Sequence, residues 1–291
     1  MSSLRELRRK IKSVKSTQQI TKAMKMVAAA RLNRAQNRIL SARPFADEME
    51  TLLHELAYLA HHREDKNAVI HPFLKQRKSR RVDLVLVSAD RGLCGGFNTN
   101  LIRRTLQYLR DHDKDDIHLW LIGKKGRDYF RRLNVNIEKE YVNFFQRLGF
   151  HQVEIIGNDV INTFMTTGTR EVVILYNEFK SRLQQRLVVK TLLPFSEVEE
   201  IKPRQDFLYE PNRPQIVAGL YPRYLKAQIF RILLESQAAE LAARMNAMES
   251  ATNNANDMIT SLTLNMNKVR QASITKEISE IVGGAEALQS N

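Results

Sequence analysis

Cysteine and long apolar runs are scarce in this sequence. Its 291 residues include one cysteine, Cys94, which excludes an internal disulfide and fits a reducing compartment. No run of about 18 uninterrupted apolar residues occurs, so we expect no membrane-spanning helix. The start lacks an apolar core of signal-peptide length. An apolar fraction of 43% nevertheless suits a folded soluble protein rather than a disordered one.

Acidic residues are scarce at the N-terminal end. Between Met1 and Arg43, twelve Lys or Arg residues accompany a single acid, Glu6, whereas the stretch from Gln271 onward has one Lys and three Glu. The formal net charge of +14 points to acidic partners, which include nucleic acid, anionic lipid and acidic protein surfaces. A solvated helix face explains a few of these charges but explains the N-terminal imbalance poorly.

Glycine is absent from two long segments, residues 1–91 and 220–282. The first glycine is Gly92, and nine of the eleven lie between Gly92 and Gly219. Because glycine is costly inside helices, this placement predicts a helix, a mixed domain and a second helix. The remaining pair, Gly283 and Gly284, is expected to break the last helix.

The first flank, residues 1–62, is predicted to be one coiled-coil helix. Apolar residues follow steps of three and four, which places them on one stripe. Pro44 should bend this helix rather than end it, because the stripe continues in step beyond it. The stripe first comprises Leu4, Leu7, Ile11 and Val14, and after a change of register it comprises Leu32, Ala35, Ile39, Ala42, Ala46, Met49, Leu53, Leu56 and Ala60.

The last flank, residues 207–287, is predicted to hold a second coiled-coil helix that starts near Tyr224. Each helix would be about 90 Å long at 1.5 Å per residue, which exceeds the needs of a globular core. Two such helices at opposite ends of one chain most simply pair as an antiparallel coiled coil. The second stripe is Leu241, Met245, Met248, Thr252, Ala255, Ile259, Leu262, Met266 and Val269, followed after a shift by Ile274, Ile278, Ile281, Ala285 and Leu288.

The middle, residues 78–200, is predicted to be a Rossmann-like α/β domain with a mostly parallel sheet. Strand-like apolar runs alternate with helical candidates, which is typical of that layering. Prolines at 194, 203, 211 and 214 mark an irregular linker into the last helix. The predicted strands lie at 82–87, 118–122, 172–176 and 187–193, and the predicted helices near 101–109, 125–133 and 153–165.

A glycine-rich stretch, residues 90–98, follows the first predicted strand and precedes a helix. Phosphate-binding loops occupy that place in α/β folds, but this one matches neither the P-loop nor the dinucleotide-binding pattern. Tight strand-to-helix packing is the favoured interpretation. Cys94 is favoured as a small structural residue over a nucleophile, because no base is placed beside it.

Two further clusters could carry chemistry. Metal binding by His61, His62 and His71 is disfavoured. The basic run from Lys75 to Arg81 resembles a nucleic-acid patch, but a solvated connector is the favoured interpretation. We therefore expect no catalytic, cofactor or metal site in this chain.

Five segments resemble the gamma subunits of F-type ATP synthases, and they occur in the family's order across nearly the whole chain. They are residues 19–29 (QITKAMKMVAA), 88–96 (SADRGLCGG), 207–211 (FLYEP), 243–248 (ARMNAM) and 267–278 (NKVRQASITKEI). The resemblance implies a shaft of coiled terminal helices whose tip lies in a ring of three alpha and three beta subunits. It also implies that the nucleotide sites belong to the ring.

Partner contacts are carried over from the same segments. The resemblance implies ring contacts for Lys22, Met24, Lys25, Arg244, Arg270, Gln271, Thr275 and Glu277. Contacts with the epsilon subunit and the membrane c-ring are implied for Phe207, Tyr209 and Glu210. The chain would then be one copy in a hetero-oligomer on the cytoplasmic face of a bacterial inner membrane, as a peripheral protein that couples proton flow to ATP chemistry and binds no nucleic acid.

Two alternatives stay open at this point. A basic coiled-coil scaffold that binds nucleic acid would explain the charge, but it explains neither the neutral-to-acidic C-terminal end nor the set of motifs. A nucleotide-dependent enzyme would use the glycine-rich stretch, and binding of ATP or NAD by the isolated chain would support it.

Overall fold

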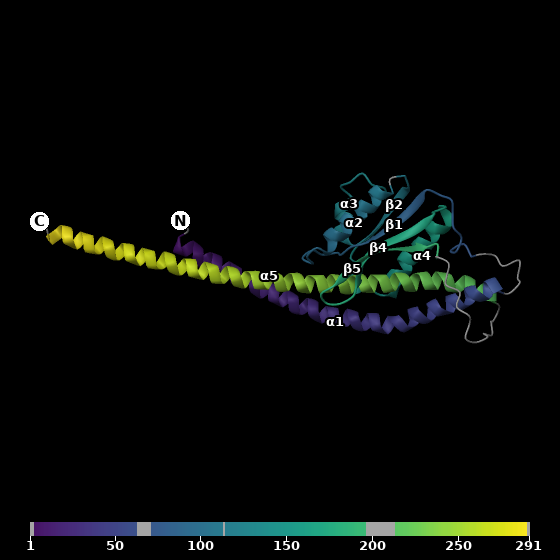
Figure 1. Ribbon diagram of the computed structural model, residues 1–291, viewed down its shortest axis with the longest axis horizontal. Coiled ribbons are helices and arrows are strands. Elements are labelled where there is room, and N and C mark those ends of the chain that lie inside the picture. Colours follow the sequence, from purple (N-terminus) through teal and green to yellow (C-terminus); the bar gives the residue numbers. More distant parts are fainter. Residues whose placement is uncertain (1–2, 63–70, 113, 196–212, 290–291) are drawn as a thin grey trace. The chain divides into compact units, whose positions relative to one another are not determined.

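The computed structural model describes residues 3–62, 71–112, 114–195 and 213–289 (Figure 1). Two compact units can be distinguished. The first, the coil unit, combines Met1–Ala28 with Met245–Asn291, and the second, the sheet unit, is Ala29–Arg244. Each unit therefore has its own packing.

The two terminal helices are long and continuous. Helix α1 spans Leu4–His62 and passes through Pro44 without ending, as predicted. Helix α5 spans Arg213–Gln289. The predicted start near Tyr224 is wrong, because the helix begins at Arg213 and continues through Gly219 and Pro222. Pro214 lies in its first turn, where a missing N–H costs little.

The predicted break at Gly283 and Gly284 is also wrong, since α5 continues through both residues. Glycine lowers helix propensity by only about 1 kcal/mol relative to alanine and keeps its backbone N–H. Adding residues to an existing helix is far easier than nucleating one, so the long helix that precedes the pair carries it onward.

The sheet unit is built on five strands in the order β3-β2-β1-β4-β5. The strands β1 (Arg81–Val87), β2 (Asp116–Ile122), β3 (Ile137–Tyr141) and β4 (Glu171–Phe179) run parallel, and β5 (Gln185–Leu193) pairs antiparallel with β4. The mostly parallel α/β sheet is thus confirmed. Strand β3 was not predicted, because it lies at the sheet edge and carries the charged residues Glu138, Lys139 and Glu140 instead of an apolar run.

Helices cover the sheet on both sides. The β1–β2 and β2–β3 crossovers carry α2 (Phe97–Asp111) and α3 (Lys124–Phe130). The β3–β4 crossover contains the short 3₁₀ helix η1 (Phe144–Arg147) and α4 (Phe150–Thr166), and it steps back across the sheet. Because such crossovers are right-handed, α4 covers the face opposite α2 and α3 (Figure 1).

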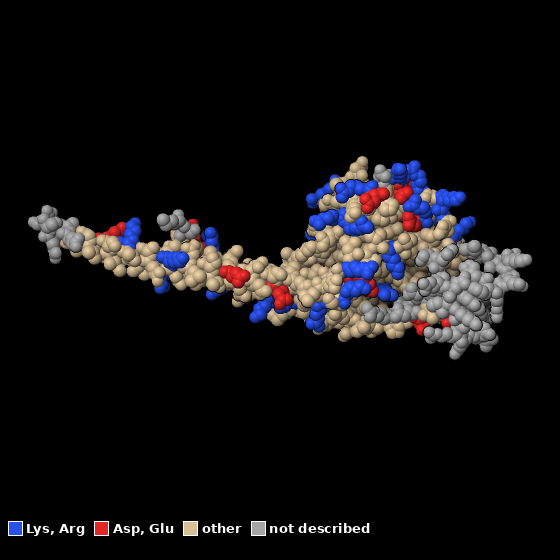
Figure 2. All heavy atoms as spheres, viewed as in Figure 1, with Lys and Arg blue, Asp and Glu red and all other residues tan. Residues whose placement is uncertain are grey.

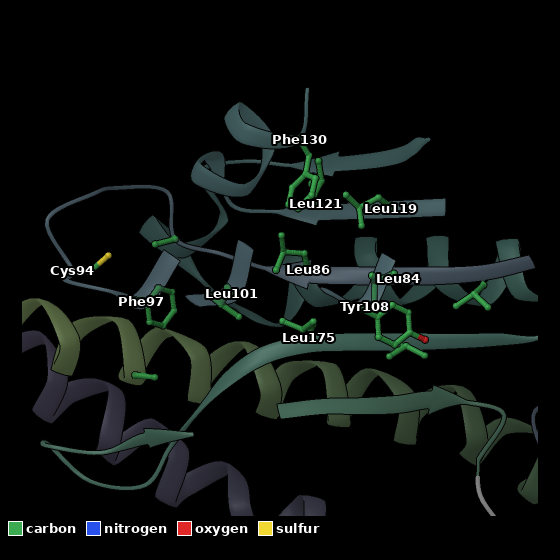
Figure 3. Packing of buried hydrophobic residues seen from close by; sticks show 14 residues of the cluster. Leu84, Leu86, Cys94, Phe97, Leu101, Tyr108, Leu119, Leu121, Phe130 and Leu175 are labelled. Atoms are coloured by element: carbon green, nitrogen blue, oxygen red, sulfur yellow. The ribbon is translucent and has the colours of Figure 1, made fainter. Parts of the chain in front are cut away.

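The core of the sheet unit lies between β1, β2, β4 and α2, and α5 contributes to it (Figure 3). Leu84, Leu86, Leu101 and Leu121 are completely buried in this cluster, and Ala239 of α5 belongs to it as well. Small alanine side chains let a helix approach a sheet closely. The core therefore ties part of the C-terminal helix to the sheet.

Candidate subunit interface

The apolar stripe of α1 continues without the change of register predicted between Val14 and Leu32. Steps of four and three lead from Val14 through positions 18, 21, 25 and 28 to Leu32. Thr21 and Ala28 are 8% and 2% exposed, so both lie on the buried side of the helix. The prediction failed because positions 18, 21 and 25 are polar, and a search for apolar residues passes over them.

Three polar contacts join α1 and α5 within the coil unit. Thr21 Oγ1 lies 2.8 Å from Thr252 Oγ1, and Lys25 Nζ lies 2.6 Å from Glu249 Oε1. Gln18 donates from Nε2 to Asn256 Oδ1. The partners on α5 descend in number as those on α1 ascend, which confirms an antiparallel pair.

Among the described residues, no helix covers the C-terminal end of α5. Counting equal steps along both helices from the Gln18–Asn256 pair puts Leu4, where α1 begins, across from Arg270. Beyond that point Ile274, Ile278 and Ile281 are 46%, 56% and 71% exposed. An apolar stripe at helical spacing that faces solvent is typical of a surface that another protein covers.

Most of the predicted ring contacts are accessible in the coil unit. Exposed side chains among them are Lys22, Arg270, Gln271, Thr275 and Glu277, and Met24 is half-buried. Lys25 is committed to its ion pair with Glu249, although its side chain is still 37% exposed.

Arg244 lies in a different environment, in the sheet unit. Its guanidinium donates to Glu240 Oε1, and both side chains are only 15% exposed. Burial raises the pKa of Glu240, and Arg244 opposes that effect. The geometry therefore makes Arg244 first of all an internal partner of Glu240.

The Cys94 thiol, which is 1% exposed, lies in the field of the same pair. Burial raises its pKa, and the Glu240 carboxylate raises it further. Since the thiolate is the reactive form, these effects agree with a structural rather than a nucleophilic cysteine.

Phe207, Tyr209 and Glu210, the predicted contacts with the epsilon subunit and c-ring, fall in residues 196–212 and lie outside the described residues. Their assignment stays a prediction.

The glycine-rich stretch is held by an acidic side chain. Asp90 Oδ1 accepts the backbone N–H groups of Lys124 at 3.1 Å and Asn143 at 2.9 Å. These N–H groups are the kind that binds a phosphate in α/β folds, and the Asp90 carboxylate already uses them. An anionic ligand there would meet a like charge, which favours the packing interpretation.

Ser88 explains two glycines after β2. Its Oγ accepts the N–H of Gly126 at 2.8 Å and lies 3.1 Å from the Ile122 carbonyl oxygen, to which it donates. Gly123 has φ of 97°, and a Cβ there would lie 2.0 Å from the Ser88 carbonyl oxygen. Only glycine fits such a position.

The basic run from Lys75 to Arg81 also proves to be structural. The Arg77 guanidinium lies 4.0 Å from the centroid of the Phe164 ring and donates to the Phe164 carbonyl. Arg80 donates to the Lys114 carbonyl, and Arg81 pairs with Asp83 and Glu138. Three arginines of the run therefore bind groups of the sheet unit itself, which disfavours a nucleic-acid patch.

The histidine cluster is not assembled as a metal site in the part that the structure describes. His71 Nδ1 accepts the Phe73 N–H at 3.3 Å, and the His71 ring stacks on Tyr221. The side chains of His61 and His62 lie outside the described ones. Within the described ranges, no three His, Cys, Asp or Glu residues are grouped so as to hold a metal, and no helix is long and apolar enough to cross a membrane.

Comparison with known proteins covers the whole fold. The family model described as ATP synthase matches residues 3–288. The gamma chain of an ATP synthase from Anaeromyxobacter sp. (strain Fw109-5) is 46% identical over 293 residues, with 99% of this chain and 100% of that protein covered. The corresponding chain of Desulfitobacterium hafniense is 42% identical over 289 residues, with the same coverage.

Solved structures give the same result. A chain in the central stalk and c-ring part of the Tetrahymena thermophila mitochondrial ATP synthase is 27% identical with a TM-score of 0.60, covering 80% of this chain and 99% of that one. A chain of the Euglena gracilis mitochondrial ATP synthase shares the fold at 21% identity with a TM-score of 0.70, covering 99% and 95%. Full-length identity of this order, together with the two long paired helices around an α/β sheet, places the chain in the family of ATP synthase gamma chains.

Proposed function

We propose that this chain is the central rotor shaft of an ATP synthase, which couples ion flow through a membrane c-ring to conformational changes at catalytic sites on beta subunits. The observation that carries the proposal is the uncovered end of α5. Ile274, Ile278 and Ile281 extend an apolar stripe beyond the last turn that α1 can cover. The tip of a shaft inside a protein ring needs such a stripe, whereas a free soluble coil would not expose it.

Asymmetry gives the shaft its mechanism. A coil of two different helices presents a different face to each of three equivalent beta subunits. Each beta subunit is thereby biased toward a different conformation and nucleotide affinity, since a partner shifts an equilibrium only through differential contacts. Rotation moves these biases from one subunit to the next, and ATP hydrolysis runs the same coupling backwards.

Polar side chains next to the uncovered stripe supply exchangeable contacts. Arg270 and Gln271 are exposed near the level at which α1 begins, and Thr275 and Glu277 follow within the next two turns of α5. The Arg270 guanidinium and the Gln271 amide can form directional hydrogen bonds with an acidic or amide-bearing loop of the ring. Such bonds can break again in the next rotary state. Lys22 and Met24 on α1 are proposed to meet the ring as well.

The positive net charge supports an acidic partner for the surface outside the coil unit. On the visible face of the sheet unit, Lys and Arg side chains predominate over acidic ones (Figure 2).

We further propose that the segment with Phe207, Tyr209 and Glu210 contacts the epsilon subunit and the c-ring. One copy of the chain would be present per complex, on the cytoplasmic face of a bacterial inner membrane. Protons would be the coupling ion.

Direct observation of rotation tests the proposal. Leu183 in the β4–β5 turn is 84% exposed, so Leu183→Cys can carry a bead. The labelled chain is assembled with alpha and beta subunits of the same source, and the ring is fixed to a surface. We expect one-directional rotation with ATP and none with a non-hydrolysable analogue. Failure to assemble, or mere diffusion of the bead in ATP, would overturn the proposal.

A further inference from the structure

Three consecutive positions of the α1 stripe are polar, and each side chain contacts a polar side chain of α5. Gln18, Thr21 and Lys25 occupy positions where the stripe of α1 would otherwise be apolar. Their partners are Asn256, Thr252 and Glu249, respectively. Apolar layers can pair in several registers with little penalty, whereas a hydrogen-bonded layer is satisfied in only one.

The central threonine layer has fewer protons than acceptors. Thr21 Oγ1 also lies 3.0 Å from the Gln18 carbonyl oxygen, and Thr252 Oγ1 lies 2.7 Å from the Met248 carbonyl oxygen. Two hydroxyl protons therefore serve three contacts. Whichever hydroxyl donates across the seam, the other keeps its bond to its own helix, so one cross-helix hydrogen bond forms in either arrangement.

The alternative that this layer opposes is a slip of one helical turn. If α1 moved toward the C-terminal end of α5, its first turns would reach Ile274 and cover part of the exposed stripe, which favours the slip. The same slip brings Gln18 toward Ile259 and separates Thr21 from Thr252. The polar contacts therefore oppose the one-turn slip that the apolar stripe alone would allow.

We propose that Thr21 and Thr252, with Gln18 and Asn256 beside them, are positioning residues that fix the axial register of α1 against α5. The register decides that α1 begins across from Arg270 and leaves Gln271 and Thr275 uncovered by it. The consequence for ATP turnover rests on the proposed function, but the register itself is a property of this chain alone.

Disulfide trapping in the full-length chain tests the register. Val14→Cys with Ile259→Cys reports the native register, because both side chains are half-buried stripe positions brought together by the Thr21–Thr252 pairing. Val14→Cys with Leu262→Cys reports a slip of one turn. Each pair is oxidised in the wild-type background and in the Thr21→Val/Thr252→Val background, which keeps side-chain volume but removes both hydroxyls.

We expect the slipped-to-native crosslink ratio to rise about fivefold in the Val/Val background, the factor that one net hydrogen bond is worth. Helicity and Tm should stay unchanged or rise, since an apolar pair replaces a polar one. Thr21→Ser/Thr252→Ser should restore the wild-type ratio. The matched control is Thr17→Val/Thr260→Val, because among the described residues those hydroxyls bond only to carbonyls of their own helices.

An unchanged ratio in the Val/Val background would overturn the proposal, as would an equal rise in the control. The readout needs no ring. A chain that fails to assemble or rotate yet shows the expected crosslinks would contradict the proposed function and leave the register assignment intact.

Discussion

The coil unit and the sheet unit of this chain are stabilised in different ways. In the sheet unit, Leu84, Leu86, Leu101 and Leu121 are completely excluded from water. In the coil unit the contacts between α1 and α5 include a threonine pair, an amide pair and a partly exposed ion pair, and Ile274, Ile278 and Ile281 of α5 are exposed. The sheet unit is therefore stabilised mainly by apolar burial, whereas the coil unit buries less apolar surface and gains specific pairing from polar contacts.

The largest effect should come from the sheet core. Phe130 is fully buried against β1 and β2, so Phe130→Ala should lower the free energy of unfolding by about 3–5 kcal/mol. Its neighbour Tyr129 is 39% exposed, and Tyr129→Ala should change it by about 0.5 kcal/mol or less. Urea unfolding measures both. Equal losses would mean that the contrast between a dense core and its surface is wrong.

Backbone geometry sharpens the same comparison. Gly123→Ala should destabilise the sheet unit by at least about 2 kcal/mol, because the new Cβ clashes with the Ser88 carbonyl and φ is positive. Gly168 also has positive φ, 68°, but no atom lies within 4 Å of its would-be Cβ. Gly168→Ala should therefore cost about 1 kcal/mol. Thermal unfolding of the two variants separates the effect of the clash from that of positive φ. Similar losses of stability in Gly123→Ala and Gly168→Ala would show that the Ser88 carbonyl does not exclude a side chain at position 123.

In the coil unit we expect effects on activity rather than on stability. Arg270→Ala with Gln271→Ala should leave helicity intact, because both side chains are exposed. It should slow ATP turnover in the reconstituted complex through the loss of a state-dependent contact worth about 1–3 kcal/mol. ATPase and ATP-driven proton pumping are measured per assembled complex. Wild-type rates for both would show that these residues are not a rotor–ring contact.

The smallest expected effect is a dependence of stability on pH. Burial lowers the pKa of His71, which packs on Phe73 and Tyr221. The unfolded chain then binds the proton more readily than the folded chain. The contribution of neutral His71 to the free energy of unfolding is therefore complete above pH about 6.5, and it is lost as the pH falls toward the lowered pKa of the folded chain. Urea titrations between pH 5 and 7 should show the decline. It should disappear in His71→Gln and persist in His151→Gln, which alters an exposed histidine.

Much of the fold could be predicted because it follows from local pattern. Alternating strands and helices indicated a mostly parallel sheet, and steps of three and four indicated the long helices. Charged β3 was missed, since an edge strand shows no apolar run. The helix ends at Tyr224 and Gly283 were misplaced, because propensity is a weak signal beside the propagation of a long helix.

The candidate interface was harder to predict than the fold. The contacts of Arg270, Gln271, Thr275 and Glu277 were predicted from family motifs, and the structure shows all four side chains exposed. The polar seam was overlooked, although an unbroken step pattern through positions 18, 21 and 25 was a signal that could have revealed it.

By itself, the sequence determined the two helices, the α/β middle and the family, since periodicity and motifs are written along the chain. Only tertiary structure decided which polar residues face each other. Thr21 meets Thr252 across 231 positions, and the Glu240–Arg244 pair, whose spacing of four residues the sequence already shows, lies largely buried instead of at the surface. The physical reason is that burial and pairing depend on what another segment brings close, and no local pattern specifies that.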